Sequence, residues 1–280
     1  MPTYLEAFRV LRKSLSQHYE NSEANAIARQ FLEAFSGKSY SALLSEDLPM
    51  SEEQNRDWQE KTAALCNGKP LQQVLGYAYF MNRRFRVNEH TLIPRPETEE
   101  LVAWIISEWQ GRSAGSILEV GAGTGCIAIS LSLALPQTTV TSIDISAAAL
   151  EIADANNQVL GARVAFQQAD FLKEKDTLPA YDIIVSNPPY IPVSEKEKLD
   201  KNVRDFEPGT ALFVPDEDPF IFYRALALYG LRFGNTPLIY CELHQDYAKQ
   251  TEQIFQSSGY DTQVRSDLFG NQRMLKAFRA

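Results

Sequence analysis

The sequence predicts an α/β protein in which a small helical bundle and a β-hairpin precede a doubly wound sheet. Near the N-terminus, apolar residues recur at steps of three or four, as on one face of a helix. From Ser116 onward, short apolar runs alternate with helical patterns, which is typical of a sheet covered by helices on both faces. Residues 77–87 lie between these parts and alternate in polarity, as hairpin strands do.

The N-terminal part is expected to contain helices over residues 5–19, 24–35, 41–44 and 51–65. Gly37 supplies a stop after the second helix. Ser51-Glu52-Glu53-Gln54 is a capping-box start for the last helix, and Asn67-Gly68-Lys69-Pro70 ends it. We therefore place a first domain at residues 1–70. Its residues alone are explained equally well by a stabilising cap and by a recognition module.

A β-hairpin linker is expected at residues 71–95, with strands over 77–81 and 84–87 and Asn82-Arg83 at the turn. Residues 91–100 read Thr-Leu-Ile-Pro-Arg-Pro-Glu-Thr-Glu-Glu, and the two prolines hold this stretch extended. Pro96 suits the first position of a helix over residues 97–109, because no helical hydrogen bond is lost there.

The third domain, residues 96–280, continues with strands and helices in alternation, which predicts a doubly wound sheet. Strands are expected over residues 117–120, 139–143, 164–167, 181–186, 238–241, 263–265 and 273–278. Helices are expected over residues 126–135, 147–160, 219–231 and 245–257.

The composition excludes several classes of protein. With 280 residues, 44% of them hydrophobic, the chain can bury a substantial core and is not a disordered segment. It has no uncharged run of 18 apolar residues, and its start lacks the apolar stretch of a signal peptide, so we expect no membrane association. Three scattered cysteines without a Cys-x-x-Cys pair fit a cytoplasmic protein and argue against disulfides and a metal site.

Charge is distributed unevenly along the chain. Residues 1–86 hold 11 Lys and Arg against 10 Asp and Glu, whereas the remaining residues hold 16 against 26. The larger part is therefore strongly acidic, and an acidic surface repels a polyphosphate backbone. Direct binding of nucleic acid is disfavoured, and a protein substrate stays open.

A glycine-rich turn joins the first strand of the third domain to the next helix, and it consists of Gly121, Ala122, Gly123, Thr124 and Gly125. Glycines there permit positive φ, and the helix N-terminus offers free N–H groups. Asp144 ends the next strand, where a carboxylate can accept both ribose hydroxyls of an adenosine. The turn lacks the Lys-Ser/Thr of a phosphate loop, and Cys126 replaces the third glycine of the dinucleotide pattern. A nucleoside without phosphate, such as S-adenosylmethionine, fits these departures best.

Asp170 and Phe171 follow the third strand of this sheet, where the sheet edge is expected to meet the adenine. The carboxylate can accept from the adenine amino group, and the ring can pack on the adenine face. We therefore assign both residues to cofactor binding.

The most specific feature is Asn187-Pro188-Pro189-Tyr190, which follows the apolar strand 181–186. The prolines remove two backbone donors and stiffen the loop, leaving the Asn187 side-chain oxygen and the Pro188 carbonyl as paired acceptors. Two such acceptors match one planar NH₂ group and stabilise positive charge that grows on its nitrogen during attack. Tyr190 can offer its ring face to the sulfonium methyl group or to the amino group. Asn187, Pro188 and Tyr190 are therefore the expected catalytic residues.

These motifs resemble the class I, seven-stranded S-adenosylmethionine-dependent methyltransferases that act on planar amino nitrogens, and they imply a Rossmann-like sheet. Two further stretches, Ile93-Pro94-Arg95-Pro96-Glu97-Thr98-Glu99 and Phe206-Glu207-Pro208, narrow the resemblance. Together with the N-terminal helices they resemble the HemK/PrmC family, the peptide chain release factor glutamine-N5 methyltransferases. The similarity spans residues 5–278.

The resemblance implies that the glycine turn, Asp144, Phe171 and Asn187 contact S-adenosylmethionine, which leaves as S-adenosylhomocysteine. It implies that residues 187–190, Pro189 included, hold a glutamine of the Gly-Gly-Gln loop of class I release factors. The resemblance further implies that the helical domain helps to dock that protein, and we expect a monomer. A related family methylates a ribosomal protein glutamine, but it usually lacks the Pro-Glu-Thr-Glu run found here at residues 96–99.

Three alternatives stay open at this point. The paired acceptors at Asn187 also suit adenine, so a nucleic-acid adenine-N6 methyltransferase is one of them, although it needs a basic groove. A nicotinamide-dependent oxidoreductase is the second, disfavoured by Cys126 and by the lack of an evident hydride-transfer base. The third is a non-catalytic protein that binds the cofactor and a partner without turnover.

Overall fold

The computed structural model describes residues 1–112 and 115–279, and the chain divides into two compact units. The first unit contains Met1–Tyr77 and also Asp200–Phe206, so it is discontinuous in sequence. The second contains Ala78–Leu199 and the residues from Glu207 onward. Within the described residues, no helix is both long enough and apolar enough to span a bilayer.

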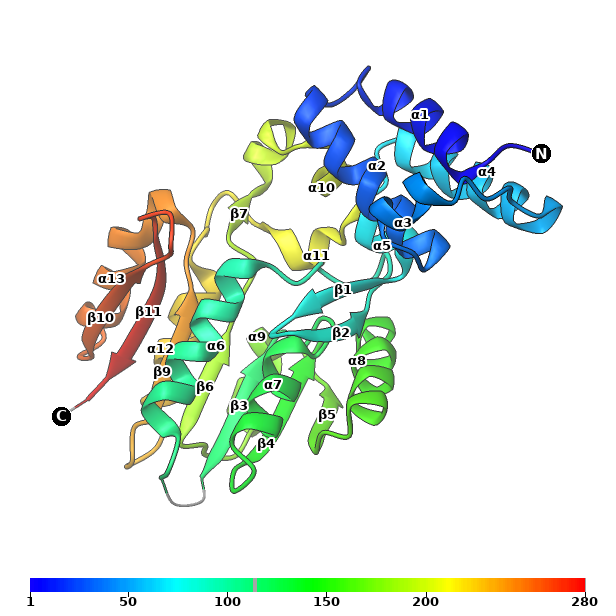
Figure 1. Cartoon of the computed structure of the whole chain (residues 1–280). Coiled ribbons are helices and arrows are strands. Elements are labelled where there is room, and N and C mark those ends of the chain that lie inside the picture. The colour runs from blue at the N-terminus through cyan, green and yellow to red at the C-terminus, as the bar shows by residue number, and fades with distance from the viewer. Residues whose placement is uncertain (113–114, 280) are drawn as a thin grey trace. The chain divides into compact units, whose positions relative to one another are not determined.

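The first unit is helical (Figure 1), and its helices are α1 (Tyr4–Leu15), α2 (Asn21–Ser36), α3 (Tyr40–Ser45), α4 (Glu52–Cys66), α5 (Leu71–Leu75) and α10 (Lys201–Phe206). The predicted helices are confirmed, including the capping box at Ser51 and a left-handed Gly37 with φ of 68°. The first helix ends at Leu15, four residues earlier than its pattern suggested. The sequence analysis missed α5 and α10, because five or six residues are too few to show a helical period.

Aromatic side chains form much of the first unit's core. The Trp58 ring packs against both Phe31 and Phe35, with ring centroids 4.8 and 5.2 Å away. The late helix α10 joins this unit through Gln73, whose side-chain amide donates to the Phe206 carbonyl at 2.8 Å.

The predicted hairpin is present as β1 (Tyr77–Phe80) and β2 (Arg83–Arg86), but its turn lies one residue earlier than expected. Met81 and Asn82 are the turn residues, with φ of 49° and 59°, because a two-residue hairpin loop favours positive φ at both positions. Asn156 holds β2 in place: its side chain accepts from the Arg86 N–H at 2.7 Å and donates to the Arg86 carbonyl at 3.1 Å.

A seven-stranded sheet forms the centre of the second unit, in the order β10-β11-β9-β6-β3-β4-β5. Strands β9, β6, β3, β4 and β5 are paired in parallel, and β11, which lies between β9 and β10, is antiparallel to both, so that β10 again runs in the direction of the parallel strands. The bounds are β3 (Ser116–Val120), β4 (Thr139–Asp144), β5 (Val164–Gln168), β6 (Ile183–Ser186), β9 (Leu238–Glu242), β10 (Asp261–Ser266) and β11 (Gln272–Phe278). The predicted α/β fold with seven strands is confirmed.

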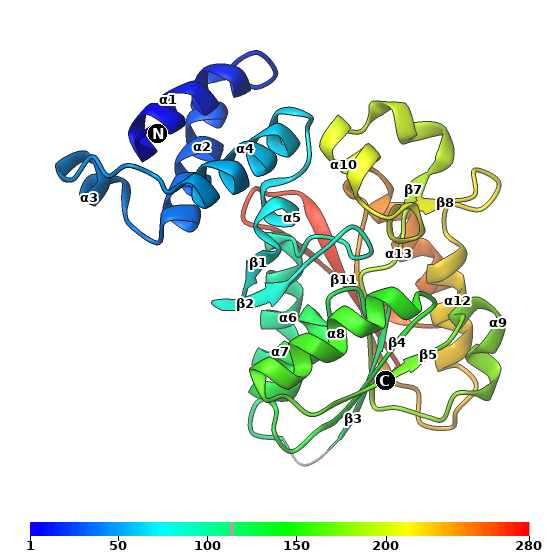
Figure 2. The ribbon, with the colours of Figure 1, turned by 90° about the vertical axis from the view of Figure 1, so that its right-hand side faces the viewer.

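Helices cover both faces of this sheet, as Figure 2 shows. One face carries α6 (Pro96–Trp109), α7 (Cys126–Ala134) and α8 (Ala147–Leu160), and the other carries α9 (Phe171–Glu174), α12 (Ile221–Gly230) and α13 (Ala248–Ser257). The strand β6 shows why two cores form: Ile183 and Val185 are buried in one, and Ile184 between them is buried in the other.

Short elements lie between β6 and α12 that the sequence analysis did not resolve. They are the parallel pair β7 (Ile191–Pro192) and β8 (Phe213–Val214), the 3₁₀ segment Val193–Lys198 and the helix α11 (Gly209–Leu212). These elements follow Asn-Pro-Pro-Tyr directly in the chain and therefore adjoin the predicted site.

Candidate active site

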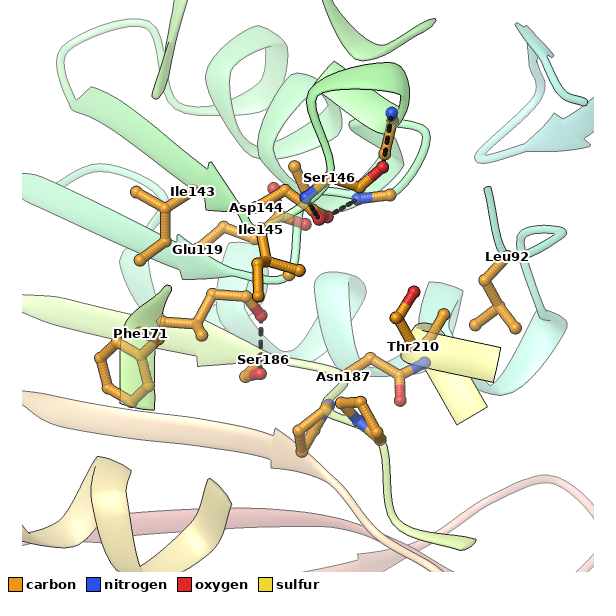
Figure 3. A pocket seen from close by; sticks show the side chains of 18 of the residues that line it. Leu92, Glu119, Ile143, Asp144, Ile145, Ser146, Phe171, Ser186, Asn187 and Thr210 are labelled. Carbon is orange, nitrogen blue, oxygen red and sulfur yellow. Dashed lines mark hydrogen bonds between the residues drawn. The ribbon is translucent and has the colours of Figure 1, made fainter. Parts of the chain in front are cut away.

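The carboxyl ends of the parallel strands bring the predicted site residues together. In the sheet register Val120 pairs with Ile143 and with Ser186, and Ser186 pairs with Cys241, so the loops that follow these residues leave at one edge. A single cavity of about 360 Å³ lies there. Figure 3 shows Ile143 and Phe171 toward one end of it, and Leu92 and Thr210 toward the other. The lining includes Gly121, Ala122, Gly123, Thr124, Asp144, Asp170, Phe171, Asn187, Pro188 and Pro189.

The glycine turn is held against the neighbouring strand by its own backbone. The N–H groups of Gly121 and Ala122 both donate to the Ile143 carbonyl, at 2.9 and 3.0 Å. Gly125 does not line the cavity, unlike the four residues before it. A Cβ at Gly125 would lie 3.0–3.2 Å from Ile129, Phe166 and Ala153, so this glycine is needed for close packing of the helix that follows.

Asp144 links the glycine turn to the loop after β4. One carboxylate oxygen accepts from the Gly123 N–H and the other from the Ser146 N–H, each at 2.9 Å. A carboxylate has about four acceptor positions, so each oxygen keeps one for a ligand. The half-buried side chain lines the cavity.

Asp170 and Phe171 also line the cavity, and both have partners of their own. Asp170 caps α9 by accepting from the Leu172 N–H at 3.1 Å, and it pairs with Lys173 at 2.9 Å. The hydrogen bond from Lys173 lowers the pKa of the Asp170 carboxyl, so the residue is ionised at neutral pH. Phe171 is 4% exposed, with its ring edge-on to Tyr229 at 5.7 Å.

Asn187 stands at the end of β6 with its side-chain NH₂ already engaged. Within the described part of the chain it makes one side-chain hydrogen bond, from Nδ2 to Thr98 Oγ1 at 3.2 Å. The Oδ1 atom is therefore left as an acceptor beside the cavity that Asn187, Pro188 and Pro189 line.

Tyr190 is placed differently from the other predicted residues, because it does not line the cavity. Its hydroxyl donates to Glu242 Oε1 at 3.3 Å, and its ring stands edge-on to His244 at 5.5 Å. In the structure Tyr190 thus belongs to a hydrogen-bond network behind the cavity wall.

Glu119 lines the cavity and was not singled out from the sequence. It is 1% exposed, Ser142 Oγ donates to its Oε2, and its Oε1 makes no hydrogen bond of good geometry with a described residue. Burial raises the pKa of its carboxyl to about 8. The sequence did show an acidic residue inside the apolar strand Ile117–Val120. Because a glutamate is rarely fully buried unless it has a partner, this position could have been recognised as a candidate site residue.

Glu207 joins two of the motifs that carried the family resemblance. This buried carboxylate pairs with Arg95 at 2.5 Å and accepts from the Ile93 N–H at 3.0 Å. The stretch Ile93-Pro94-Arg95 is thereby fixed to the segment that starts at Glu207 and leads into α11. Pro94 and Arg95 from the first stretch, Leu92 just before it, and Pro208 and Thr210 from the second segment line the same cavity.

The residues around the cavity fit S-adenosylmethionine, which carries a sulfonium and an ammonium charge. Three carboxyl groups line it, those of Glu119, Asp144 and Asp170, and one buried Glu119 oxygen is unpartnered. The Arg95 guanidinium, also in the lining, is engaged by Glu207. With Asp170 ionised and Arg95 engaged, the charges of the lining favour a cationic ligand and disfavour a phosphate. Within the described residues, no group of three or more His, Cys, Asp or Glu is arranged to hold a metal ion.

The fold and the site together define a methyltransferase that uses S-adenosylmethionine, and the comparisons with known proteins agree. Residues 100–204 match the family described as Methyltransferase small domain, and residues 6–76 match the PrmC N-terminal domain. Among solved structures, the catalytic domain of hMettl16 in complex with the MAT2A 3′UTR hairpin 6 has a TM-score of 0.56, covering 83% of each chain at 14% identity. That likeness concerns the fold.

Curated relatives identify the family. The chain is 40% identical to a release factor glutamine methyltransferase of Bacteroides thetaiotaomicron over 275 residues, which cover 96% of this chain and 98% of that protein. It is 38% identical to the enzyme of that name from Flavobacterium psychrophilum, over 94% of this chain and 95% of that one. The chain belongs to the release factor glutamine methyltransferase family.

Proposed function

We propose that this enzyme transfers a methyl group from S-adenosylmethionine to the side-chain amide nitrogen, N5, of the glutamine in the Gly-Gly-Gln motif of class I peptide chain release factors. The observation that carries the proposal is the Asn187 amide. Its NH₂ is bound to Thr98, and its oxygen is left as an acceptor in the cavity that the glycine turn also lines. The nitrogen–methyl bond forms as the sulfur–methyl bond of the cofactor breaks, and the amide nitrogen then loses one proton to solvent, so S-adenosylhomocysteine is the expected second product.

The chemistry follows from what an amide nitrogen needs. Its lone pair is delocalised into the carbonyl group, so it is a weak nucleophile. Asn187 Oδ1 and the Pro188 carbonyl can accept hydrogen bonds from the two N–H groups of the substrate amide. These hydrogen bonds favour a pyramidal nitrogen and stabilise positive charge that develops there. Bound S-adenosylmethionine supplies an electrophilic methyl group on a sulfonium. Holding the two reactants in line contributes roughly 7–11 kcal/mol to such a reaction.

We assign the cofactor to the residues that line the cavity near the glycine turn. Gly121, Ala122, Gly123 and Thr124 would receive its methionine part, with Glu119 opposite the positive charge. Asp144 would accept the ribose hydroxyls, and Asp170 and Phe171 would contact the adenine. The acidic lining and the buried, unpartnered Glu119 oxygen support this assignment. Gly125 shapes the turn through its packing.

We further propose that the helical unit docks the release factor. The match of residues 6–76 to the PrmC N-terminal domain supports a family-specific role for this unit.

The decisive test is to incubate the enzyme with a purified release factor and methyl-labelled S-adenosylmethionine. We expect label on the Gly-Gly-Gln glutamine alone, located by mass spectrometry. A release factor with that glutamine changed to alanine, and the enzyme variant Asn187→Ala, are the matched controls and should take up no label. Label on another residue, or label on an RNA or DNA duplex in place of the protein, would contradict the proposal.

A further inference from the structure

A buried chain of hydrogen bonds lies directly behind Asn187. Asn187 Nδ2 donates to Thr98 Oγ1 at 3.2 Å, and Thr98 Oγ1 donates to Glu242 Oε2 at 2.5 Å. Thr98 is 3% exposed and Glu242 2%. Thr98 lies in the first turn of α6, Asn187 follows β6 and Glu242 ends β9, so three elements distant in sequence converge on one contact.

The direction of these hydrogen bonds is set by Glu242. An ionised carboxylate can only accept, so the single hydroxyl proton of Thr98 must point to Glu242. The Thr98 oxygen is then an acceptor toward its other neighbour. It therefore meets the NH₂ end of the Asn187 amide. In the flipped amide two acceptors would face each other in a buried site, which is strongly unfavourable.

We infer that Thr98 and Glu242 are positioning residues that hold the Asn187 amide with its oxygen, and not its NH₂ group, toward the substrate. The inference rests on the proposed function, because that orientation matters only if Asn187 must accept an N–H bond from the substrate. A flipped Asn187 would present two donors to the two donors of the glutamine amide. Orientation by a second layer of residues is a general requirement of precise sites.

The second oxygen of Glu242 is also engaged, which keeps the carboxylate itself fixed. Tyr190 donates to Oε1 at 3.3 Å, and the Tyr223 hydroxyl donates to the main-chain carbonyl of Glu242 at 2.9 Å. The position of Tyr190 behind the cavity wall is thereby explained: it secures the carboxylate that orients Asn187.

The network also predicts a dependence on pH. Burial raises the pKa of Glu242 to about 6, and the negative charge of Glu97 on α6 acts in the same direction. The hydrogen bonds from Thr98 and Tyr190 and the charge of Arg273 on β11 oppose this shift. A protonated Glu242 can donate to Thr98, which frees the hydroxyl proton to turn toward Asn187. The turnover number is therefore expected to rise with pH through about 6.

The test compares Thr98→Val, Thr98→Ser and Glu242→Gln with the wild-type enzyme. Valine keeps the volume of threonine without the acceptor, whereas serine keeps the hydroxyl. Glutamine has an NH₂ group that can donate to the Thr98 oxygen, which frees the Thr98 hydroxyl proton to turn toward Asn187. We expect kcat on release factor to fall about tenfold to a hundredfold in Thr98→Val and Glu242→Gln, and less than about threefold in Thr98→Ser. S-adenosylmethionine affinity, measured by calorimetry, should stay within about twofold, and the rise near pH 6 should disappear in Thr98→Val.

The outcomes separate this inference from the proposed function. A wild-type enzyme that does not methylate the release factor contradicts the proposed function. An active wild type whose Thr98→Val and Glu242→Gln variants keep kcat within twofold overturns the positioning role alone. Equal losses in Thr98→Ser and Thr98→Val also overturn it, because packing and not the hydroxyl would then be responsible. Should valine prevent folding, Thr98→Ala provides the same comparison with serine.

Discussion

The surroundings of two carboxyl groups in the cavity shift their pKa values in opposite directions. The pKa of Asp170 is lowered chiefly by its hydrogen bond from Lys173, whereas burial raises the pKa of Glu119 to about 8. Asp170 is consequently a fixed negative charge at neutral pH, whereas the Glu119 carboxyl keeps its proton to a higher pH. Burial of an acid with one unpartnered oxygen costs stability, and such a cost is typical of a functional site.

The raised pKa of Glu119 predicts a pH dependence of stability. The native protein holds this proton between about pH 4.5 and 8, where the unfolded chain has lost it. Its contribution to the free energy of unfolding is therefore full below pH 4.5 and is lost as pH rises through 8. The slope is at most about 1.4 kcal/mol per pH unit within that window. Glu119→Gln removes this proton, so denaturant unfolding from pH 5 to 8.5 should show a flatter profile than wild type. Parallel profiles would contradict the buried, protonated state.

Asp144 gives a second prediction at this scale, on ligand affinity. Asp144→Ala should weaken S-adenosylmethionine binding by about 1–3 kcal/mol, because hydrogen bonds from the ribose to a charged acceptor are lost. Calorimetry measures this directly. Asp144→Asn is the matched control, since it keeps one acceptor oxygen for the Gly123 or Ser146 N–H and should lose less. Unchanged affinity in the alanine variant would show that the ribose lies elsewhere.

At the scale of elements, the long periodic segments were predictable and the short ones were not. The helix Ala147–Leu160 was predicted with its observed bounds, because its period, the Ser146 cap and Gly161 agree. The hairpin turn was predicted one residue too late because Met81 adopts positive φ, a conformation that is uncommon for methionine and that the sequence does not indicate. The cavity residues after β3, β4 and β6 were predictable because parallel strands end at one edge. Thr98 and Glu242 were not, since their role depends on contacts between distant elements.

The glycine turn and α7 offer a prediction at the element scale. Gly123 and Gly125 both have positive φ, at 52° and 77°, so alanine at either position is strained by about 1–2 kcal/mol. A Cβ at Gly123 meets nothing within 4 Å, whereas one at Gly125 meets Ile129, Phe166 and Ala153 at 3.0–3.2 Å. Gly125→Ala should therefore destabilise the fold by roughly a further 1–3 kcal/mol from overpacking. Equal shifts of the denaturation midpoint in the two variants would show that packing at Gly125 is unimportant.

At the scale of the whole molecule, the first unit is built from two segments that are far apart in the sequence. Residues 200–206 follow the strands β1 to β7 in the chain, yet they belong with the N-terminal helices. Nothing in Lys201–Phe206 shows a period that would assign it to either unit. The functional boundaries at residues 70 and 95 stay predictions, because a docking role depends on the partner.

Removing residues 1–70 tests whether the helical unit docks the partner. The cavity is lined only by residues from His90 to Phe222, so S-adenosylmethionine affinity should stay within about twofold. If the unit supplies docking contacts, the KM for intact release factor should rise by about tenfold or more, while methylation of a short Gly-Gly-Gln peptide should change little. Truncation also removes most of the unit to which α10 belongs and leaves only the part of it around Gln73. A second truncated chain, in which residues 200–206 are replaced by Gly and Ser, controls for the exposure of α10. If the truncated chain loses both cofactor binding and methylation of the partner, the helices are required for folding. An unchanged KM would show that the helices do not take part in recognition of the release factor.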